Sequence, residues 1–565
     1  MAQVAAPAPP AETTSAPKLP AKELTGAVVY QFLLAEIAAQ RGQLEFSAGA
    51  YLDLAKLTRD PRIVRRAAEI GLHARQYATA LEATRLWLEI EPEALQPRQM
   101  ETLLLLTSGR IDELVNKIAA DLKLAGPRTG ETLIGVLRAF ARHTDKAVTQ
   151  RIIDRITEPY LELAEAHLAR AHAAAGVSDA ARARAEIDEA LRLRPDWELA
   201  ALFKSDLLAR SGGQLDFLQD FLSTYPAAHD VRLGYARALV AAKRFEAARS
   251  EFRRLLDQNA NNTDLLYAIG ILSLQLDDAT EAEQHLTRFV AIGRGEQLDA
   301  ARFYLGQIAD QAGRADDALR WYRAVVAGEQ KVPAHIRAAQ VLVRMGRLDE
   351  AREQLAAARA GEPGETSEPG AASDMRLLIA EAQLLRDAGR HPEAYALLNK
   401  ALEAQPNDPD LLYETALAAE KLDNMGVAER LLRRLMQIKP DSPQGYNALG
   451  FSFADRNVRL EEAAVLIDKA LALAPADGYI LDSKGWLLFR QGDVKGALEI
   501  LQKAYAMKPD AEIAAHIGEV LWSLGRRDEA TSVWRDAVKL NPGNDVLSAT
   551  IKRLTTPTPT SAPTP

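Results

Sequence analysis

The feature that most constrains the fold of this chain is a repeat of about 34 residues. Prolines recur at spacings of 34, 35, 34 and 33 residues, and alanines keep the same four spacings. The prolines are Pro406, Pro440, Pro475, Pro509 and Pro542, and the alanines are Ala394, Ala428, Ala463, Ala497 and Ala530. Such self-similarity predicts an array in which each unit buries its apolar face only against its neighbours.

The clearest unit, residues 478–511, shows what each repeat contains. It divides into two amphipathic helices, and its small residues stand where these helices would pack closely, at Gly485, Ala497 and Ala504. Pro509 then ends the second helix, because proline lacks the backbone donor that a helix interior needs. This pattern resembles the tetratricopeptide repeat (TPR). The resemblance implies an all-α solenoid of stacked antiparallel helix pairs in a right-handed superhelix.

Fainter copies of the unit begin near Val28, Pro61 and Ala164, while residues 95–160 and 196–226 keep helical periodicity without the repeat. We expect about 13 to 15 helix pairs in all. The predicted organisation is a disordered Pro/Ala-rich tail (1–27), a partly degenerate TPR array (28–360), a polar linker or loop (361–374), a well-formed TPR array (375–544), and a short helix with a Pro/Thr tail (545–565).

Composition narrows the possible functions. The chain has 69 Lys and Arg against 78 Asp and Glu, a net charge of −9, which gives no general attraction to nucleic acid. The absence of cysteine excludes disulfides, thiolate metal sites and a cysteine-linked lipid anchor on this chain. No stretch approaches the roughly 18 apolar residues of a membrane span.

Catalytic motifs are missing from the sequence. There is no phosphate-binding P-loop, no dinucleotide fingerprint, no nucleophile elbow and no zinc-protease motif. The nearest histidines, His167 and His172, are five apart and do not share a helical face as a metal pair would, and we expect His167 to pack among small and apolar side chains. We therefore predict a protein that is not an enzyme and needs no cofactor or metal.

The first helices of the last four repeats carry the candidate partner-binding residues. In TPR proteins, positions 2, 5, 9, 12 and 13 of each repeat generally face a concave groove. Large rings beside a few polar groups at these positions suit an extended peptide or a partner helix. The residues are Tyr413, Asn447, Phe451, Tyr479, Asp482, Trp486, Phe489, Arg490 and Trp522. The alternative is that Trp486 and Phe489 only fill the contact between neighbouring repeats.

A narrower resemblance is carried by the N-terminal block, residues 29–42, with residues 50–55 and 58–61 after it. These segments are similar to the large TPR proteins of proteobacterial envelopes, some of which are adaptors for a periplasmic carboxyl-terminal processing protease. The resemblance implies a periplasmic or envelope-associated scaffold that holds such a protease together with its cell-wall hydrolase substrates. The missing lipid-bearing cysteine departs from the lipoprotein members of that group.

Two other interpretations remain open. Residues 1–20 contain no apolar signal core, so the sequence as read predicts no export signal, which fits a cytoplasmic assembly or regulatory adaptor of the same fold. The chain could also be a non-catalytic subunit of an enzyme complex. All three interpretations share protein or peptide partners and exclude nucleic acid.

Overall fold

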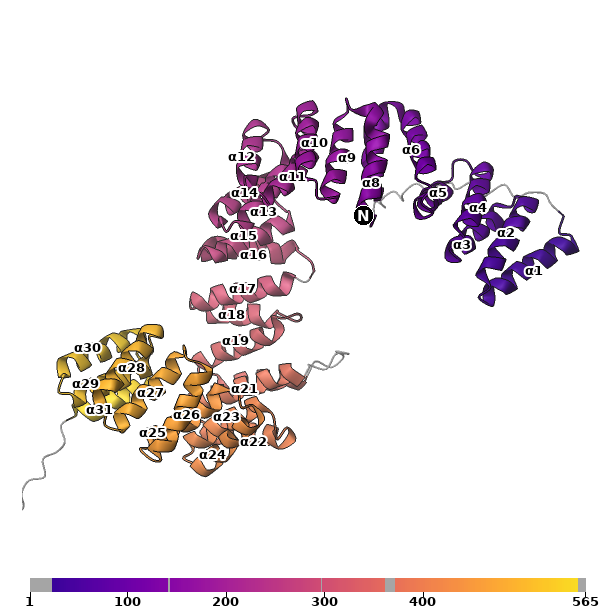
Figure 1. The fold of residues 1–565 in the computed structure, drawn as a ribbon. Helices are drawn as coiled ribbons and strands as arrows, with labels where there is room; N and C mark the ends of the chain where they lie inside the picture. The colour runs from indigo at the N-terminus through magenta and orange to yellow at the C-terminus, as the bar shows by residue number, and fades with distance from the viewer. Residues whose placement is uncertain (1–22, 141–142, 296, 361–370, 557–565) are drawn as a thin grey trace, which may run out of the picture. The chain divides into compact units, whose positions relative to one another are not determined.

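The computed structural model describes residues 23–140, 143–295, 297–360 and 371–556. Over these residues the secondary structure consists of 31 α-helices and two short 3-10 helices, with no strand (Figure 1). The prediction of an all-α chain is confirmed. The chain divides into two compact units, Met1–Ala260 and Asn261–Pro565.

The first unit contains helices α1 to α14. They are α1 (Gly26–Gln40), α2 (Leu44–Thr58), α3 (Pro61–His73), α4 (Tyr77–Ile90), α5 (Leu95–Thr107), α6 (Ile111–Ala125), α7 (Thr129–Phe140), α8 (Lys146–Thr157), α9 (Ala164–Gly176), α10 (Ala180–Leu193), α11 (Glu198–Ala209), α12 (Gln214–Thr224), α13 (His229–Ala241) and α14 (Phe245–Gln258), with 3-10 turns η1 (Gly126–Arg128) and η2 (Glu158–Tyr160).

The second unit contains helices α15 to α31. They are α15 (Thr263–Gln275), α16 (Ala279–Ile292), α17 (Gln297–Gln311), α18 (Ala315–Arg323), α19 (Lys331–Arg344), α20 (Leu348–Ala360), α21 (Ala371–Asp387), α22 (His391–Ala404), α23 (Pro409–Lys421), α24 (Met425–Ile438), α25 (Pro443–Asp455), α26 (Leu460–Leu473), α27 (Gly478–Arg490), α28 (Val494–Met507), α29 (Ala511–Ser523), α30 (Arg527–Leu540) and α31 (Asp545–Thr555).

Within each unit the helices form consecutive pairs, an odd-numbered first helix followed by an even-numbered second helix. Helices α1 to α30 make fifteen such pairs, in agreement with the predicted number, and α31 packs on α29 after the last pair. Most helices contact the next helix in the chain, and the first helices of adjacent pairs also contact one another in places such as α25 and α27. This nearest-neighbour packing is that of a helical solenoid.

The repeated small residues explain why the paired helices lie so close. All five of the periodic alanines from Ala394 to Ala530 are at most 1% exposed. A Cβ atom added at Gly485 would come 2.6 Å from Leu501 of the partner helix, so only glycine fits this contact without rearrangement. Each periodic proline lies just after the second helix of its repeat. Pro509, for example, is two residues beyond Met507, the last residue of α28. The predicted role of each small residue is confirmed.

The predicted tails and linker fall largely on residues 1–22, 361–370 and 557–565, which lie outside the described part of the chain. Residues 371–374 of the predicted linker are the first turn of α21, and the expected short helix after residue 544 is α31.

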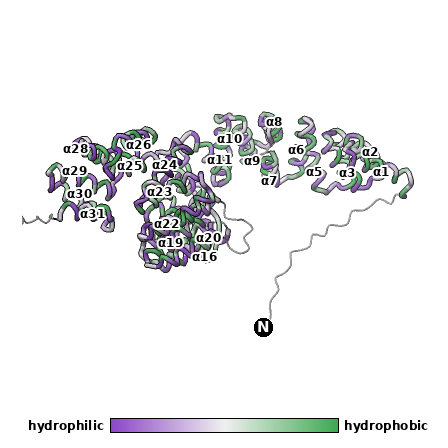
Figure 2. The backbone as a smooth tube through the Cα atoms, turned by 90° about the horizontal axis from the view of Figure 1, so that it is seen from below, coloured by the Kyte–Doolittle hydropathy of each residue, from purple (hydrophilic) through white to green (hydrophobic). Residues whose placement is uncertain are grey.

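Polar and apolar residues alternate along the chain within single helices, which is the pattern of half-buried helices (Figure 2). Among the described helices, none combines the length and the apolar character required to cross a membrane.

Candidate protein-binding site

Four rings on three successive first helices form one cluster in the second unit. His516 of α29 stacks on Trp486 of α27, with ring centroids 4.2 Å apart. Phe451 of α25 lies 6.0 Å from the His516 ring, and Phe489 of α27 lies 5.2 Å from the Trp486 ring. We call Phe451, Trp486, Phe489 and His516 the aromatic cluster. It brings together three of the residues that the repeat pattern selected and one that it did not.

Asp482 fixes His516 within the aromatic cluster. The Nδ1 atom of His516 lies 2.9 and 3.0 Å from the two carboxylate oxygens of Asp482, and both side chains are buried. Burial disfavours the charged imidazole, but the charge and hydrogen bond of Asp482, with the charges of Asp455 and Glu519, outweigh it and raise the pKa of His516. The pair is therefore a buried electrostatic contact between adjacent repeats.

Exposure separates the members of the aromatic cluster. The Trp486 side chain is 4% exposed, and its Nε1 atom is buried with no hydrogen-bond partner among the described residues. This burial favours the packing alternative for Trp486. Phe451 and Phe489 are only partly buried and lie at the margin of the apolar core. Trp486 and His516 thus form the inner part of the cluster, and the two phenylalanines form its accessible part.

Arg490 connects two first helices. Its Nε and a terminal nitrogen donate hydrogen bonds to the carbonyl oxygens of Ala454 and Asp455, at 3.1 and 2.7 Å. Both carbonyls belong to the last turn of α25. That of Ala454 also accepts a hydrogen bond from the Asn457 amide, and Arg490 adds a side-chain cap to the end of this helix. Its guanidinium also lies 5.6 Å from the centre of the Trp486 ring. Two hydrogen bonds and one ring contact thus fix the Arg490 side chain at the edge of the aromatic cluster.

Tyr479, at the start of α27, is 45% exposed and lies beside the turn that leads into α29. The Lys508 amine lies 3.9 Å from the centre of its ring, and its hydroxyl lies 3.4 Å from an Asp510 carboxylate oxygen. The structure gives no contact between Tyr479 and the aromatic cluster.

The remaining predicted residues lie on neighbouring first helices. Tyr413 of α23 is partly buried against the core, and burial raises its pKa. Asn447 of α25 has a buried Oδ1 atom without a hydrogen-bond partner among the described residues. The ring of Trp522 in α29 lies 5.7 Å from the ring of Trp534, beneath the guanidinium of Arg527. The part that these residues play in binding stays a prediction.

Sequence reasoning missed His516, the centre of the aromatic cluster. A signal was available, because Asp482 and His516 are 34 residues apart, one repeat length. Residues separated by one period lie on adjacent first helices and can meet. Neighbours within one helix do not reveal this contact, because Asp482 and His516 belong to different repeats.

His167 also has a polar partner outside its own helix. The prediction places it among small and apolar side chains, but its Nδ1 atom lies 2.7 Å from a Glu186 carboxylate oxygen and its Nε2 atom lies 2.9 Å from the Leu161 carbonyl oxygen. The expectation was wrong because Glu186 reaches His167 from the second helix of the pair. Among the described residues, no group of three or more histidine or acidic side chains is placed to hold a metal ion.

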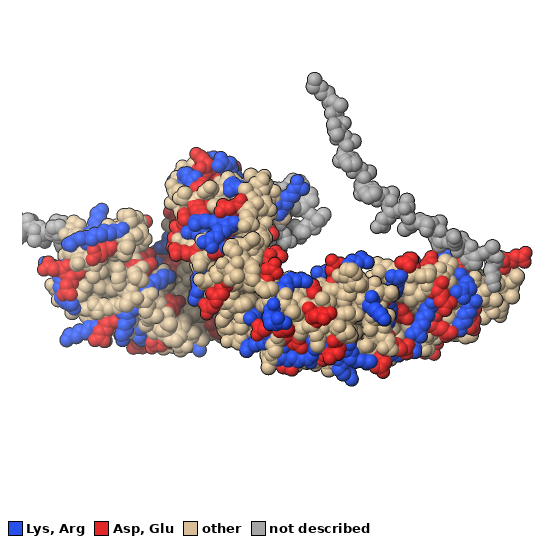
Figure 3. All heavy atoms as spheres, turned by 90° about the horizontal axis from the view of Figure 1, so that it is seen from above, with Lys and Arg blue, Asp and Glu red and all other residues tan. Residues whose placement is uncertain are grey.

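The charged surface agrees with the balanced composition. On the face shown in Figure 3, basic and acidic side chains are interspersed, and the described residues there form no large area of one sign. Ion pairs such as that between Arg433 and Glu462, 2.6 Å apart, link successive second helices.

These features define a helical-repeat protein of stacked pairs. Family models described as tetratricopeptide repeats match residues 215–272 and 385–450, 267–333 and 454–512, 332–357, and 511–544. The chain is 32% identical to the TPR repeat-containing protein PA4667 of Pseudomonas aeruginosa over 563 residues, covering 97% of this chain and 92% of the relative. The chain belongs to the tetratricopeptide-repeat family.

Solved structures that match parts of this chain include proteins from yeast and from Parabacteroides merdae. Yeast Tom70 matches 76% of this chain and 95% of its own, with 15% identity and a TM-score of 0.38. A TPR protein from Parabacteroides merdae matches 52% of this chain and 99% of its own, with 16% identity and a TM-score of 0.34.

Proposed function

We propose that this chain is a non-catalytic scaffold that binds a protein or peptide partner on the first-helix face of its second unit. The observation that carries the proposal is the aromatic cluster, in which two accessible rings, Phe451 and Phe489, rest on a buried and hydrogen-bonded platform. Rings held in this way can contact a partner with little further loss of conformational freedom. Aromatic side chains are also the residue class that most often dominates protein interfaces.

Asp482 and Arg490 support this role indirectly. The carboxylate fixes the orientation of His516, on which Trp486 stacks. Arg490 ties α27 to the end of α25 and keeps Phe489 and Phe451 on one platform. The wider array offers further first helices, so a second partner could be held nearby at a raised effective concentration without chemistry by the scaffold.

The specific role that we propose is recruitment of a periplasmic carboxyl-terminal processing protease and its cell-wall hydrolase substrates. Its support is the similarity of residues 29–42 and the segments after them to envelope TPR adaptors, together with the relative of nearly equal length in a proteobacterium. The proposed location is the periplasm or cell envelope. Cell fractionation tests the location: recovery in the cytoplasm would favour the assembly or regulatory adaptor instead.

Affinity capture from native extract, read by mass spectrometry, tests the partner and the surface together. The bait is the full chain, compared with a Phe451→Ala/Phe489→Ala variant. Recovery of the processing protease or wall hydrolases by wild type, with at least a tenfold loss in the variant, supports the proposal. Equal recovery by both baits would contradict the assignment of the surface.

Tyr505→Ala is the matched control for this capture. Tyr505 lies on the second helix α28, is partly buried, and packs on the same apolar core as Phe489. The Tyr505→Ala substitution therefore removes a comparable ring from the second helix of the pair that contains Phe489. The control should retain the partners, and thermal melts of all three proteins show that each is folded.

A further inference from the structure

One helix pair in the first unit differs from all the others. Fourteen of the fifteen pairs pack their two helices against each other, whereas α7 and α8 have scarcely any direct contact. Helix α7 packs on α6 and α9, and α8 packs on α6 and α9. The irregular stretch at residues 95–160, where the repeat signature fades, contains this pair. The result is an opening between two helices that a regular repeat would close.

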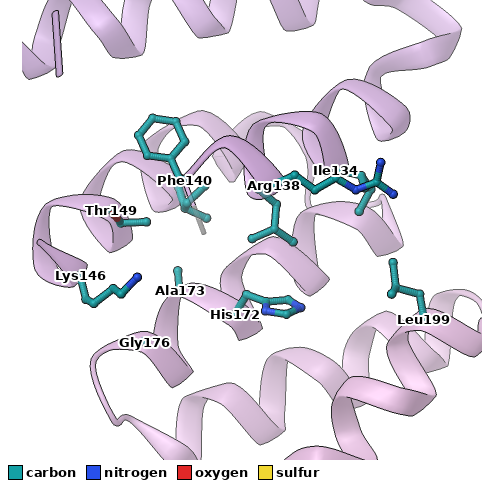
Figure 4. A pocket seen from close by; sticks show the side chains of 11 residues that line it. Ile134, Arg138, Phe140, Lys146, Thr149, His172, Ala173, Gly176 and Leu199 are labelled. Carbon is teal, nitrogen blue, oxygen red and sulfur yellow. The ribbon is translucent and has the colours of Figure 1, made fainter. Parts of the chain in front are cut away.

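A pocket of about 320 Å³ occupies this place, between α7, α8, α9 and the start of α11 (Figure 4). This volume lies at the lower end of the range for small-molecule sites, about 300–1,000 Å³. Phe140, Ile153 and Ala173 on its wall are buried members of one apolar core cluster. Ile134 and Leu137 pack against a second cluster. The walls are therefore part of the folded core and are formed before any ligand arrives.

The charged lining residues are both basic. Arg138 and Lys146 line the pocket, and none of the described lining residues is acidic. In Figure 4 these two side chains lie on opposite sides of His172. The alkyl chain of Lys146 lies along Gly176, whose added Cβ would be 3.5 Å from the lysine Cδ.

His172 provides a polar group inside the pocket. Its ring packs on Phe203, with centroids 3.7 Å apart, and neither ring nitrogen has a hydrogen-bond partner among the described residues. Burial lowers its pKa to about 4, so the imidazole is neutral near pH 7. A neutral imidazole can donate one hydrogen bond and accept another.

We propose that this pocket binds a small amphiphile consisting of an apolar chain and a carboxylate. The apolar part lies against Ile153, Ala173 and Leu137, and the carboxylate pairs with Arg138, whose exposed guanidinium can hold both carboxylate oxygens. Lys146 adds positive potential at the other end. Two sources carry this chemistry, a free fatty acid and the carboxyl terminus of a peptide that ends in an apolar residue. The site does not depend on the function proposed above.

Isothermal titration of the full chain with four probes tests the site. The probes are decanoate, decanol, a hexapeptide ending in leucine with a free carboxyl group, and the same hexapeptide with an amidated end. We expect at least one carboxylate probe to bind, and its uncharged counterpart to bind at least about threefold more weakly. Binding of decanoate alone identifies a fatty acid, and binding of the free peptide alone identifies a chain terminus. The proposal fails if neither acid binds, or if the uncharged probes bind equally well.

Two variants and one control locate the binding. Arg138→Gln removes an exposed charge and should lower the affinity for the carboxylate probe roughly three- to fivefold. Arg151→Gln, on an exposed position of α8 that does not line the pocket, should leave the affinity unchanged. Ala173→Phe, checked for folding by its thermal melt, should abolish binding by filling the pocket. Unchanged affinity in Arg138→Gln, or in a folded Ala173→Phe protein, would overturn the assignment.

Discussion

Asp482 and His516 are 34 residues apart in the sequence, and their side chains meet at 2.9 Å across two adjacent first helices of the array. The contact links one repeat to the next and fixes the His516 ring within the aromatic cluster. It also gives the second unit a titratable group whose charge is coupled to folding.

Stability of the second unit should depend on the protonation of His516. Folding raises the pKa of this imidazole above its ordinary value of 6.5, so the folded chain holds the proton more tightly than the unfolded chain. The stabilisation is fully present below pH 6.5 and is lost as the pH rises through the folded pKa. We expect the free energy of unfolding lost in His516→Gln to be larger at pH 6 than at pH 9. Urea unfolding of wild type and His516→Gln measures this loss at each pH. A loss in free energy of unfolding that is the same at both pH values would refute the coupling.

His172 should give the opposite pH dependence. Burial lowers its pKa from 6.5 to about 4, so the folded chain binds this proton less readily than the unfolded chain. The stability of the first unit should fall as the pH decreases from about 6.5 to about 4, by on the order of 2–3 kcal/mol. His172→Phe removes the titrating group and should flatten this part of the profile, as followed by urea unfolding. If the variant has the same acid dependence as wild type, His172 is not its source.

Packing between paired helices should make Gly518 intolerant of a side chain. A Cβ atom there would lie 1.9 Å from Nε1 of Trp534, which is 2% exposed, so the indole must move. Gly518→Ala should lower the free energy of unfolding by about 1–3 kcal/mol.

Gly426→Ala is the control for that substitution. Gly426 also lies in a helix, and the nearest atom to its added Cβ is 3.8 Å away on the Arg430 side chain. The alanine should raise stability by about 0.4–1 kcal/mol, because it restricts the unfolded chain. Thermal melts of both variants provide the comparison, and equal effects would contradict the described packing.

The repeat period predicted the fold because it reports local packing. A small residue such as Ala497 or Gly485 must recur wherever two helices approach closely, and that requirement is visible in the sequence. The same period placed Trp486 on a first helix but could not tell whether its ring faces a partner or the next repeat. That distinction depends on His516, which belongs to another repeat and has no equivalent elsewhere in the pattern.

The pocket between α7 and α8 could not be predicted for a related reason. Loss of the repeat signature over residues 95–160 shows that packing there is irregular, but it does not show which helices separate. The opening depends on how α7 and α8 each pack on α9. Its lining residues, such as Arg138 and His172, therefore come together only in the folded chain.

The proposed role is that of a scaffold without catalysis of its own. The decisive measurement is the cleavage of a cell-wall hydrolase by the purified processing protease, with and without this chain. The chain alone should cleave nothing, whereas wild type and Tyr505→Ala should accelerate cleavage by the protease. Phe451→Ala/Phe489→Ala, folded by its melt, should lose most of this acceleration. Cleavage by the chain alone would contradict the absence of catalysis, and full acceleration by the double variant would contradict the role of the aromatic cluster.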